Sequence, residues 1–235
     1  MMNVASCVGL SQSTNIDSCS LFALMEARSA MGTHETNPRK TPRQTRSRAT
    51  VDAIVEATIR VLLARGYDGT TTIAVAARAG VSVGSLYQYF PNKEALVATL
   101  VERHAAAIVA RVEGALAEAD PADPEAAVRA FVRAGLDAQR ISPALHKILI
   151  EQLPRVGRLA EVAETSRKLA VLLERRLVPH RARLAVPDVR LAAFVVETAL
   201  EALGHRVIIE EPHLIGTAKL EAEATTLALA YLFGP

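Results

Sequence analysis

The chain has no tryptophan, and aromatic residues make up only 4% of its 235 residues. Its two cysteines, Cys7 and Cys19, both lie in the first 20 residues, in a segment that we expect to be unstructured. A disulfide framework is therefore not expected, and no Cys/His cluster with the spacing of a zinc site occurs in the sequence. We expect neither a metal nor a cofactor.

Long apolar runs are also missing. No run reaches the roughly 18 residues that a membrane-spanning helix needs, and the N-terminus lacks the basic start and apolar stretch of a signal peptide. We therefore expect a cytoplasmic protein that does not contact a membrane. Half of the residues are hydrophobic, glycine and proline are few, and helix-favouring Ala, Leu, Arg and Glu are abundant. This composition predicts an all-α fold.

Three segments are expected along the chain. Residues 1–36 are rich in Ser, Thr and Asn, which predicts a disordered tail. We hypothesise that translation starts at Met25 or Met31. The residues before that methionine would then be an extension that the true protein lacks. Residues 37–95 are expected to form a basic arm and a small helical domain, and residues 96–235 a larger helical domain.

Positive charge is concentrated in the smaller of these domains. Residues 39–94 contain nine basic and four acidic residues, a net charge of +5, whereas residues 111–235 contain 16 basic and 17 acidic residues. This asymmetry favours a polyanionic partner for the first domain, although a solvated charged surface would give the same count. Pro38 and Pro42 predict that the basic arm, residues 37–48, is extended.

Apolar spacing and capping residues define the helices that follow. A helix is expected from Val51 to Gly66, a two-turn helix from the threonines at 70–72 to Gly80, and a short helix that begins after Ser82. Further helices are expected at 93–119, after Asp123, after Ser142 with an interruption at Pro154, and at 159–177, 188–209 and 217–232.

The two short helices have the features of a helix-turn-helix unit. Gly80 can adopt the left-handed conformation that the turn needs, and Leu86 and Phe90 lie four residues apart on the face that packs inward. The other face begins with small residues, so that the helix N-terminus can approach DNA closely. Two helices joined in this way form a DNA-reading unit.

The residues of this unit resemble one family closely. Gly66-Tyr67, Thr70-Thr71 and the run from Val75 to Leu96, VAARAGVSVGSLYQYFPNKEAL, are similar to the signature of the tetracycline-repressor (TetR/AcrR) family. The similarity covers about 50 residues with the preceding helix. Val75 stands where Ile is usual, and apolar Ile73 and Val83 occupy positions that are often polar or basic, which favours apolar contact with thymine methyl groups.

The resemblance implies a DNA-binding domain of three helices plus the start of a fourth, followed by a helical domain that dimerises and binds an inducer. It implies phosphate contacts for Thr71, Tyr87 and Lys93, and an arm along the DNA backbone or minor groove. The arm residues are Arg43, Arg46 and Arg48. The residues expected to face the major groove are Ser82, Val83, Gly84, Ser85 and Gln88; for Gln88, simple solvation is an equal alternative.

Two C-terminal helices resemble the dimerisation pair of the family. The expected interface residues form one stripe on each helix: Phe194, Val195, Thr198 and Ala202 on the first, and Leu227 and Tyr231 on the second. The full stripes, with Leu220, Ala224 and Ala228 in the second, could instead belong to the core of one subunit. A two-fold dimer predicts a palindromic operator.

A ligand pocket is expected among the middle helices. The candidates are residues that interrupt apolar helical faces or lie between them: His104, Phe131, Gln139, His146, Gln152 and Glu197. Side chains of this kind are more often surface or internally satisfied groups than ligand contacts. The low aromatic content favours a mostly apolar small-molecule inducer.

We therefore expect a homodimeric transcriptional repressor that a small molecule releases from double-stranded DNA. An activator of the same family is the alternative, and an architectural DNA-binding protein without a ligand is disfavoured by the large second domain. An enzyme is not expected, because no nucleophile motif, phosphate loop or paired catalytic carboxylates stand out in the sequence.

Overall fold

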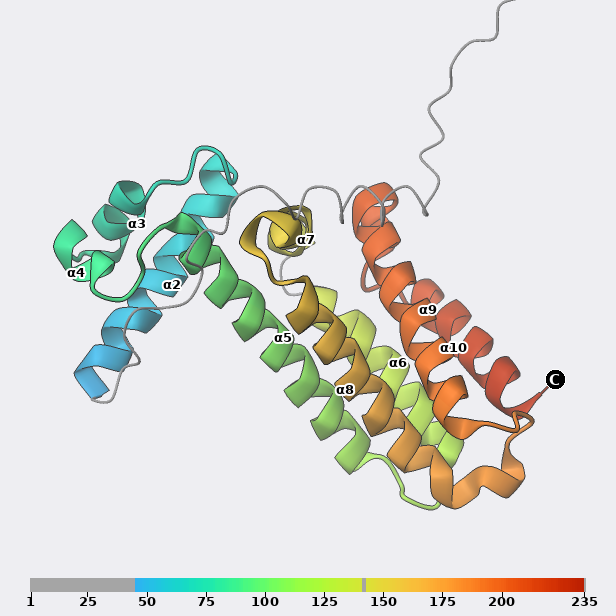
Figure 1. The fold of residues 1–235 in the computed structure, drawn as a ribbon. Coiled ribbons are helices and arrows are strands. Elements are labelled where there is room, and N and C mark those ends of the chain that lie inside the picture. The colour runs from blue at the N-terminus through green and yellow to red at the C-terminus, as the bar shows by residue number, and fades with distance from the viewer. Residues whose placement is uncertain (1–44, 141–142, 235) are drawn as a thin grey trace, which may run out of the picture. The chain divides into compact units, whose positions relative to one another are not determined.

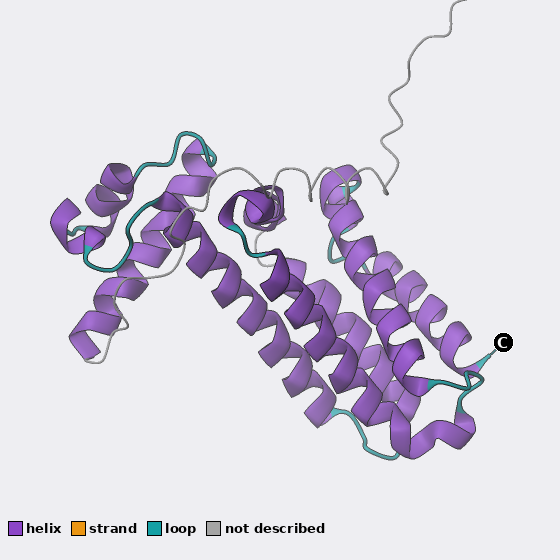
Figure 2. Ribbon diagram, viewed as in Figure 1, coloured by secondary structure: helices purple, strands orange, loops and turns teal. Residues whose placement is uncertain are grey.

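The computed structural model describes residues 45–140 and 143–234, and this part of the chain is helical and contains no strand (Figure 2). The expected tail, the two candidate start methionines and Arg43 lie outside the described residues. The α-helices are α2 (Thr45–Arg65), α3 (Thr72–Ala79), α4 (Val83–Tyr87), α5 (Lys93–Glu118), α6 (Pro124–Arg140), α7 (Pro143–Val156), α8 (Leu159–Leu177), α9 (Val189–Glu210) and α10 (Ala218–Phe233). Two short 3-10 segments, Val178–Arg183 and Pro212–Leu214, follow α8 and α9. The expected all-α fold is confirmed (Figure 1).

Most helices begin where the sequence places a capping side chain. Ser82, Asn92 and Asp188 each accept a hydrogen bond from a backbone N–H three residues further on, and Asp123 accepts two at the start of α6. Among the three candidate threonines, Thr71 caps α3. Such caps satisfy backbone donors that have no partner within the helix.

Two predicted helix boundaries are wrong. Helix α2 begins at Thr45 rather than Val51, so the extended arm expected to reach residue 48 has turned into helix before that point. No proline lies between Pro42 and the end of α2, and the hydroxyl of Ser47 is 2.9 Å from the Tyr89 hydroxyl, a contact that holds the first turn against the domain. Helix α7 continues through Pro154 to Val156, because a proline so close to the helix end removes only one late hydrogen bond.

The apolar core has two parts, and α5 belongs to both. The first cluster joins α2, α3 and α4 to the N-terminal half of α5, which buries Leu96 and Val97 there, and to α7. The second cluster joins the C-terminal half of α5, at Val112 and Leu116, to α6, α8, α9 and α10. A single continuous helix therefore connects the packing of the helix-turn-helix unit to that of the larger domain (Figure 1).

None of the helices in the described residues is long and apolar enough to cross a membrane.

Candidate DNA-reading face and ligand cavity

The turn between α3 and α4 has the geometry that the sequence predicts. Gly80 is left-handed at φ 69°, and its N–H and that of Val81 donate to the carbonyls of Ala77 and Ala76, which closes the end of α3. A residue with a side chain would be strained in this conformation. Leu86 and Phe90 are fully buried beneath α4 and fix its orientation.

The outer face of α4 is open to solvent. Ser82, Val83, Gly84 and Gln88 are exposed, and Ser85 is half-buried. The Ser82 hydroxyl accepts a hydrogen bond from the Ser85 N–H and lies 2.8 Å from the Ser85 hydroxyl. Two of the five residues expected in the major groove thus also form the cap of α4. The face is small and polar apart from Val83, which leaves room for base edges to approach.

The three residues expected to touch phosphates have different surroundings. Thr71 is exposed, and its hydroxyl oxygen caps α3, so its hydrogen remains available for donation. Tyr87 is exposed, with its hydroxyl 3.0 Å from that of Thr72. Lys93 is half-buried: its Nζ donates to the Tyr67 carbonyl and lies 4.2 Å from the centre of the Tyr67 ring. Lys93 therefore also fastens α5 to the loop after α2.

The arm residues are placed only in part. Arg48 is exposed in the first turns of α2 rather than on an extended segment, and Arg46 belongs to the same helix. The sequence-based prediction had put both on an arm. For Arg48, a contact with the DNA backbone would have to come from the helix itself.

A basic groove between α2 and α3 was not predicted. It is lined by Arg60, Arg65 and Arg78 and also by Thr71, one of the expected phosphate-contacting residues. Arg60 forms an ion pair with Glu56 one turn earlier in α2. Each of these arginines was part of the basic charge count, but only the fold brings α2 and α3 side by side and gathers them around Thr71.

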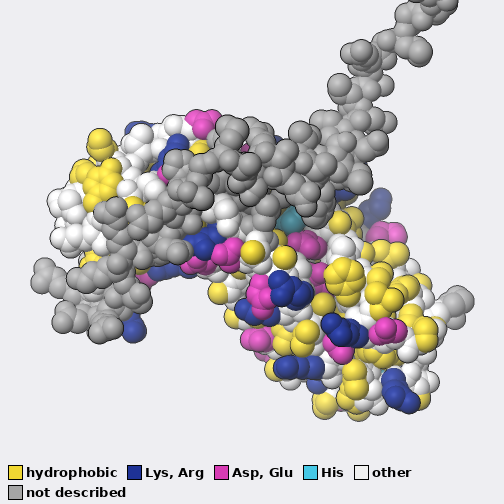
Figure 3. Space-filling model, viewed as in Figure 1, with side chains coloured by type: hydrophobic (Ala, Val, Ile, Leu, Met, Phe, Trp, Pro, Cys, Tyr) yellow, Lys and Arg dark blue, Asp and Glu magenta, His cyan; other side chains and the backbone are white. Residues whose placement is uncertain are grey.

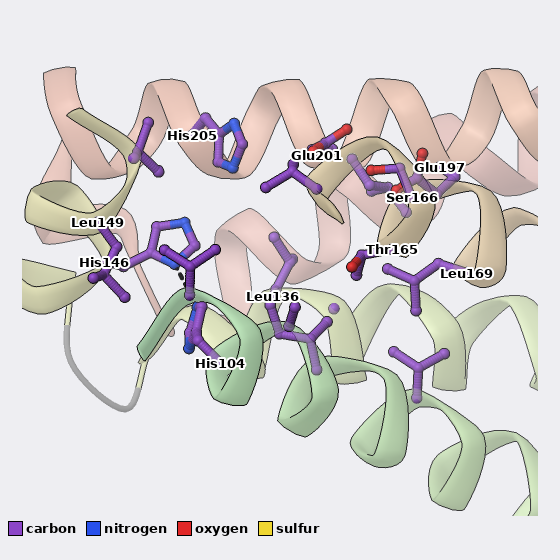
Figure 4. Close-up of a pocket in the computed structure, with 18 of the residues that line it drawn as sticks. His104, Leu136, His146, Leu149, Thr165, Ser166, Leu169, Glu197, Glu201 and His205 are labelled. Atoms are coloured by element: carbon purple, nitrogen blue, oxygen red, sulfur yellow. Dashed lines mark hydrogen bonds between the residues drawn. The ribbon is translucent and has the colours of Figure 1, made fainter. Parts of the chain in front are cut away.

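A cavity of about 120 Å³ lies between α5, α6, α7, α8 and α9 (Figure 4). Its walls are mostly aliphatic, with His104 from α5, Thr165 and Ser166 from α8, and Glu197 and Glu201 from α9 among the polar exceptions. Within the described part of the chain, no lysine or arginine lines it. The arrangement is that of a small-molecule site, an apolar hollow with a few polar groups.

Four of the six predicted pocket residues line this cavity: His104, Phe131, His146 and Glu197. Gln152 is not one of its lining residues; it lies near the end of α7, beyond the turns that reach the cavity, and its role as a ligand residue stays a prediction. Gln139 is part of α6, but its side chain lies outside the described residues.

The sequence analysis missed four polar lining residues. Thr165, Ser166, Glu201 and His205 also line the cavity. Glu201 and His205 follow Glu197 at intervals of four along α9, a spacing that could have shown all three to share one helical face.

Three histidines from three helices meet at one end of the cavity. The His104 Nε2 and His146 Nδ1 atoms are 2.7 Å apart, and the ring centres of His146 and His205 are 5.5 Å apart. Burial lowers the pKa of His146 to about 3, and the neighbouring His104 and His205 add to this shift. Burial also lowers the pKa values of His104 and His205, with Glu201 opposing the shift at His205. The cluster is therefore uncharged at neutral pH.

The carboxyl groups of Glu197 and Glu201 lie closer to the N-terminal end of α9 than His205 does. Burial raises the pKa of Glu197 to about 8, the Glu201 carboxylate adds to the shift, and a hydrogen bond with Ser166 opposes it. Glu197 is only 4% exposed and is therefore mainly protonated at neutral pH. No group of three or more His, Cys, Asp or Glu side chains among the described residues is arranged to hold a metal ion.

The cavity and the helix-turn-helix unit share residues. Val101 of α5 and Leu149 of α7 line the cavity and are also buried in the cluster that contains Leu86 and Phe90. Arg158, which is buried and precedes α8, pairs with Glu102 of α5 and Glu161 of α8 at 2.8 and 2.6 Å. A molecule in the cavity would therefore press on side chains that support the DNA-reading face.

The two C-terminal helices carry an apolar outer face. The six expected interface residues, Phe194, Val195, Thr198, Ala202, Leu227 and Tyr231, are all exposed in the single chain. Phe194 is 53% and Leu227 58% exposed, and Figure 3 shows apolar side chains gathered over this region. By contrast, Leu220, Ala224 and Ala228 are buried within the chain. These three residues pack against the chain's own helices, as in the alternative that they belong to the core of one subunit.

Comparison with known families gives two matches. Residues 54–100 match the model of bacterial regulatory proteins of the tetR family, and residues 123–232 match a tetracyclin repressor-like C-terminal domain. Together the two matches cover more than half of the chain.

Individual proteins agree with the family matches. The regulator TcmR of Streptomyces glaucescens is 28% identical over 77% of this chain and 80% of its own length. The regulator BetI of Burkholderia thailandensis is 37% identical, but over 40% of this chain and 48% of BetI. For BetI and for YvkB of Bacillus subtilis, which matches over 38% of its length, the chain thus spans less than half of the relative.

Solved structures share the fold. The fatty acid degradation regulator FadR of Bacillus halodurans has a TM-score of 0.62 at 21% identity, covering 81% of this chain and 96% of FadR. SmeT, the repressor of a multidrug efflux pump of Stenotrophomonas maltophilia, has a TM-score of 0.61 at 20% identity, covering 78% and 92%. With its helix-turn-helix unit, its helical second domain and both family matches, the chain belongs to the TetR family of bacterial regulatory proteins.

Proposed function

We propose that this protein is a homodimeric repressor of transcription that binds a palindromic operator in double-stranded DNA and is released from it by a small molecule. The observation that carries the proposal is the exposed, small-residue face of α4, held by the left-handed turn at Gly80 and by buried Leu86 and Phe90. This is the geometry with which a helix enters the major groove. Binding to genomic DNA places the protein in the cytoplasm.

The cavity supports release by a ligand. SmeT has been solved in complex with triclosan, and FadR is named for fatty acid degradation, so this fold accommodates small molecules in at least one protein that shares it. In this chain, Val101 and Leu149 connect the cavity wall to the core of the DNA-reading domain. A ligand that favours a different packing of α5 and α7 lowers operator affinity by a population shift.

The apolar face of α9 and α10 supports a dimer, and a two-fold dimer fits a palindromic operator. The apolar face formed by Phe194, Val195, Leu227 and Tyr231 has the composition of an interface core, and two copies would form a bundle of four helices. Two-fold symmetry would place the recognition helices about 34–36 Å apart, one turn of DNA.

Selection of bound DNA from a random pool tests the proposal. We expect a near-palindromic site, and we expect Lys93→Ala to weaken its binding about tenfold and to lower the salt dependence by about one counterion. Lys168→Ala, which removes an exposed positive charge from α8, is the matched control and should leave the affinity unchanged. Selection that yields no enriched site, or equal effects of the two substitutions, would contradict the proposal.

Two other roles are weaker. An activator would bind DNA with the same face, and a transcription assay with the selected operator distinguishes the two signs of regulation. An enzymatic role has no support in the cavity: its one potential carboxyl pair, Glu197 and Glu201, lies on one helix with no nucleophile motif beside it.

A further inference from the structure

The polar lining of the cavity has one sign of charge. Two carboxyl groups, Glu197 and Glu201, enter it from adjacent turns of α9, and among the described residues no lysine or arginine lines it. The other titratable lining groups are His104 of α5, His146 of α7 and His205 of α9; α6 and α8 contribute none. Thr165 and Ser166 of α8 also line the cavity, and Ser166 lies beside Glu197 (Figure 4).

One buried polar atom in this cavity has no partner. His146 is 6% exposed, its Nδ1 faces His104, and its Nε2 makes no hydrogen bond with the described residues. If Nδ1 donates to His104, the Nε2 lone pair is free to accept from a donor in the cavity. Leaving such a buried atom without a partner is unfavourable, so a donor-bearing occupant is favoured.

From this geometry we infer that the cavity binds a small lipophilic cation, a protonated amine with an apolar body. This inference specifies the ligand class of the proposed repressor and rests on that proposal only for its regulatory meaning. The aliphatic walls take the body of the ligand, the carboxyl groups of α9 take its charge, and His146 or Ser166 can accept its N–H groups. A carboxylate ligand would place like charge beside Glu201 with no lysine or arginine to pair with it.

The size of the cavity limits the occupant. An apolar cavity of about 150 Å³ in another protein holds benzene. The cavity here measures about 120 Å³ and is therefore smaller, so an amine of roughly seven non-hydrogen atoms is close to the upper limit and requires some outward movement of the aliphatic walls. Cyclohexylammonium, uncharged cyclohexanol and anionic cyclohexanecarboxylate form a series that keeps the ring and changes the charge.

Binding of the cation should displace a proton. Glu197 is mainly protonated when the cavity is empty, because burial raises its pKa to about 8. A bound ammonium group would stabilise the carboxylate, so binding at pH 7 should release up to one proton. His104, His146 and His205 are already uncharged at this pH and have no proton of this kind to release.

Titration calorimetry on the full chain tests the inference. We expect cyclohexylammonium to bind at least about tenfold more tightly than cyclohexanol, with proton release detected by comparing buffers of different ionisation enthalpy. Glu197→Gln should remove most of this preference and the proton release, because the amide keeps the shape but not the charge. The same variant should still bind cyclohexanol, which shows that its cavity is intact. Exposed Glu113→Gln on α5 is the matched control.

Three results would overturn the inference: no binding of the amine, equal binding of the three probes, or tighter binding of the carboxylate. A preference that survives in Glu197→Gln and in Glu201→Gln would do the same. Operator selection is carried out without a ligand, so its outcome is separate: an operator-binding dimer that ignores amines leaves the repressor proposal standing and removes only this one.

Discussion

At the residue scale, two buried groups in one cavity make stability depend on pH in opposite directions. His146 has a lowered pKa, so the unfolded chain binds the proton that the folded chain excludes, and stability falls as the pH drops below 6.5. Glu197 has a raised pKa, so the folded chain binds a proton that the unfolded chain releases above 4.5. Its contribution is complete below pH 4.5 and is lost as the pH rises toward 8.

The window between about pH 7.5 and 8 isolates Glu197, because the histidines of the unfolded chain, with an ordinary pKa of about 6.5, are then already about nine-tenths deprotonated. We expect the free energy of unfolding of the wild type to fall across this window, by at most about 1.4 kcal/mol per pH unit. Glu197→Gln should flatten the decline, since the amide does not titrate. Urea unfolding at a fixed protein concentration measures this. Glu113→Gln should keep the wild-type slope, and an unchanged slope in Glu197→Gln would contradict the assignment.

The polar residues of the cavity were predictable only where a polar side chain interrupts an apolar helical face. His104, His146 and Glu197 were found in this way. Glu201 and His205 were not predicted, because several polar residues on one face of α9 are typical of a face that is exposed to solvent. Their burial follows from the packing of α8 against α9, which no local pattern encodes.

At the element scale, the turn between α3 and α4 depends on backbone conformation alone. A Cβ at Gly80 would meet no atom within 4 Å, but φ is +69°. We expect Gly80→Ala to lower the free energy of unfolding by about 1–2 kcal/mol, the cost of the left-handed region for a residue with a side chain. Chemical denaturation measures this.

Gly114→Ala is the matched control for the turn. This glycine lies inside α5 and also has open space around its Cβ position. Alanine there should raise stability by about 0.5–1 kcal/mol, because glycine is a poor helix former. The same substitution thus has opposite signs at two uncrowded positions, and a loss of stability at both would contradict the assignment of the Gly80 cost to φ.

Element ends that depend on local chemistry were predicted well, and those that depend on tertiary contacts were not. Ser82, Asn92, Asp123 and Asp188 cap helices as expected because a cap is a contact within four residues. The start of α2 at Thr45 was missed because the contact between Ser47 and Tyr89 spans 42 residues.

At the scale of the whole molecule, the apolar face of α9 and α10 is the proposed dimer interface. We expect Phe194→Glu to shift the protein from dimer to monomer and to weaken operator binding, because a charge placed in an interface core is desolvated without a partner. Sedimentation equilibrium and operator titration measure the two effects.

Val171→Glu is the matched control for assembly. It introduces the same charge at an exposed apolar residue of α8, outside the expected interface. This variant should remain a dimer. If Phe194→Glu also remains a dimer, the face of α9 and α10 is not the interface, and the palindromic operator loses its structural basis.

The sharing of α5 between two cores has a consequence for protein engineering and for evolution by recombination. A fragment cut at residue 95 would lose the buried stretch from Leu96 to Val101 and the support of Leu149 and Val156 on α7. The DNA-reading unit is therefore not a transplantable module. A chimera that exchanges operator specificity with another regulator needs its junction beyond Val101 and must carry compatible residues on α7. Recombination can therefore transfer the DNA-reading unit only together with part of the larger helical domain.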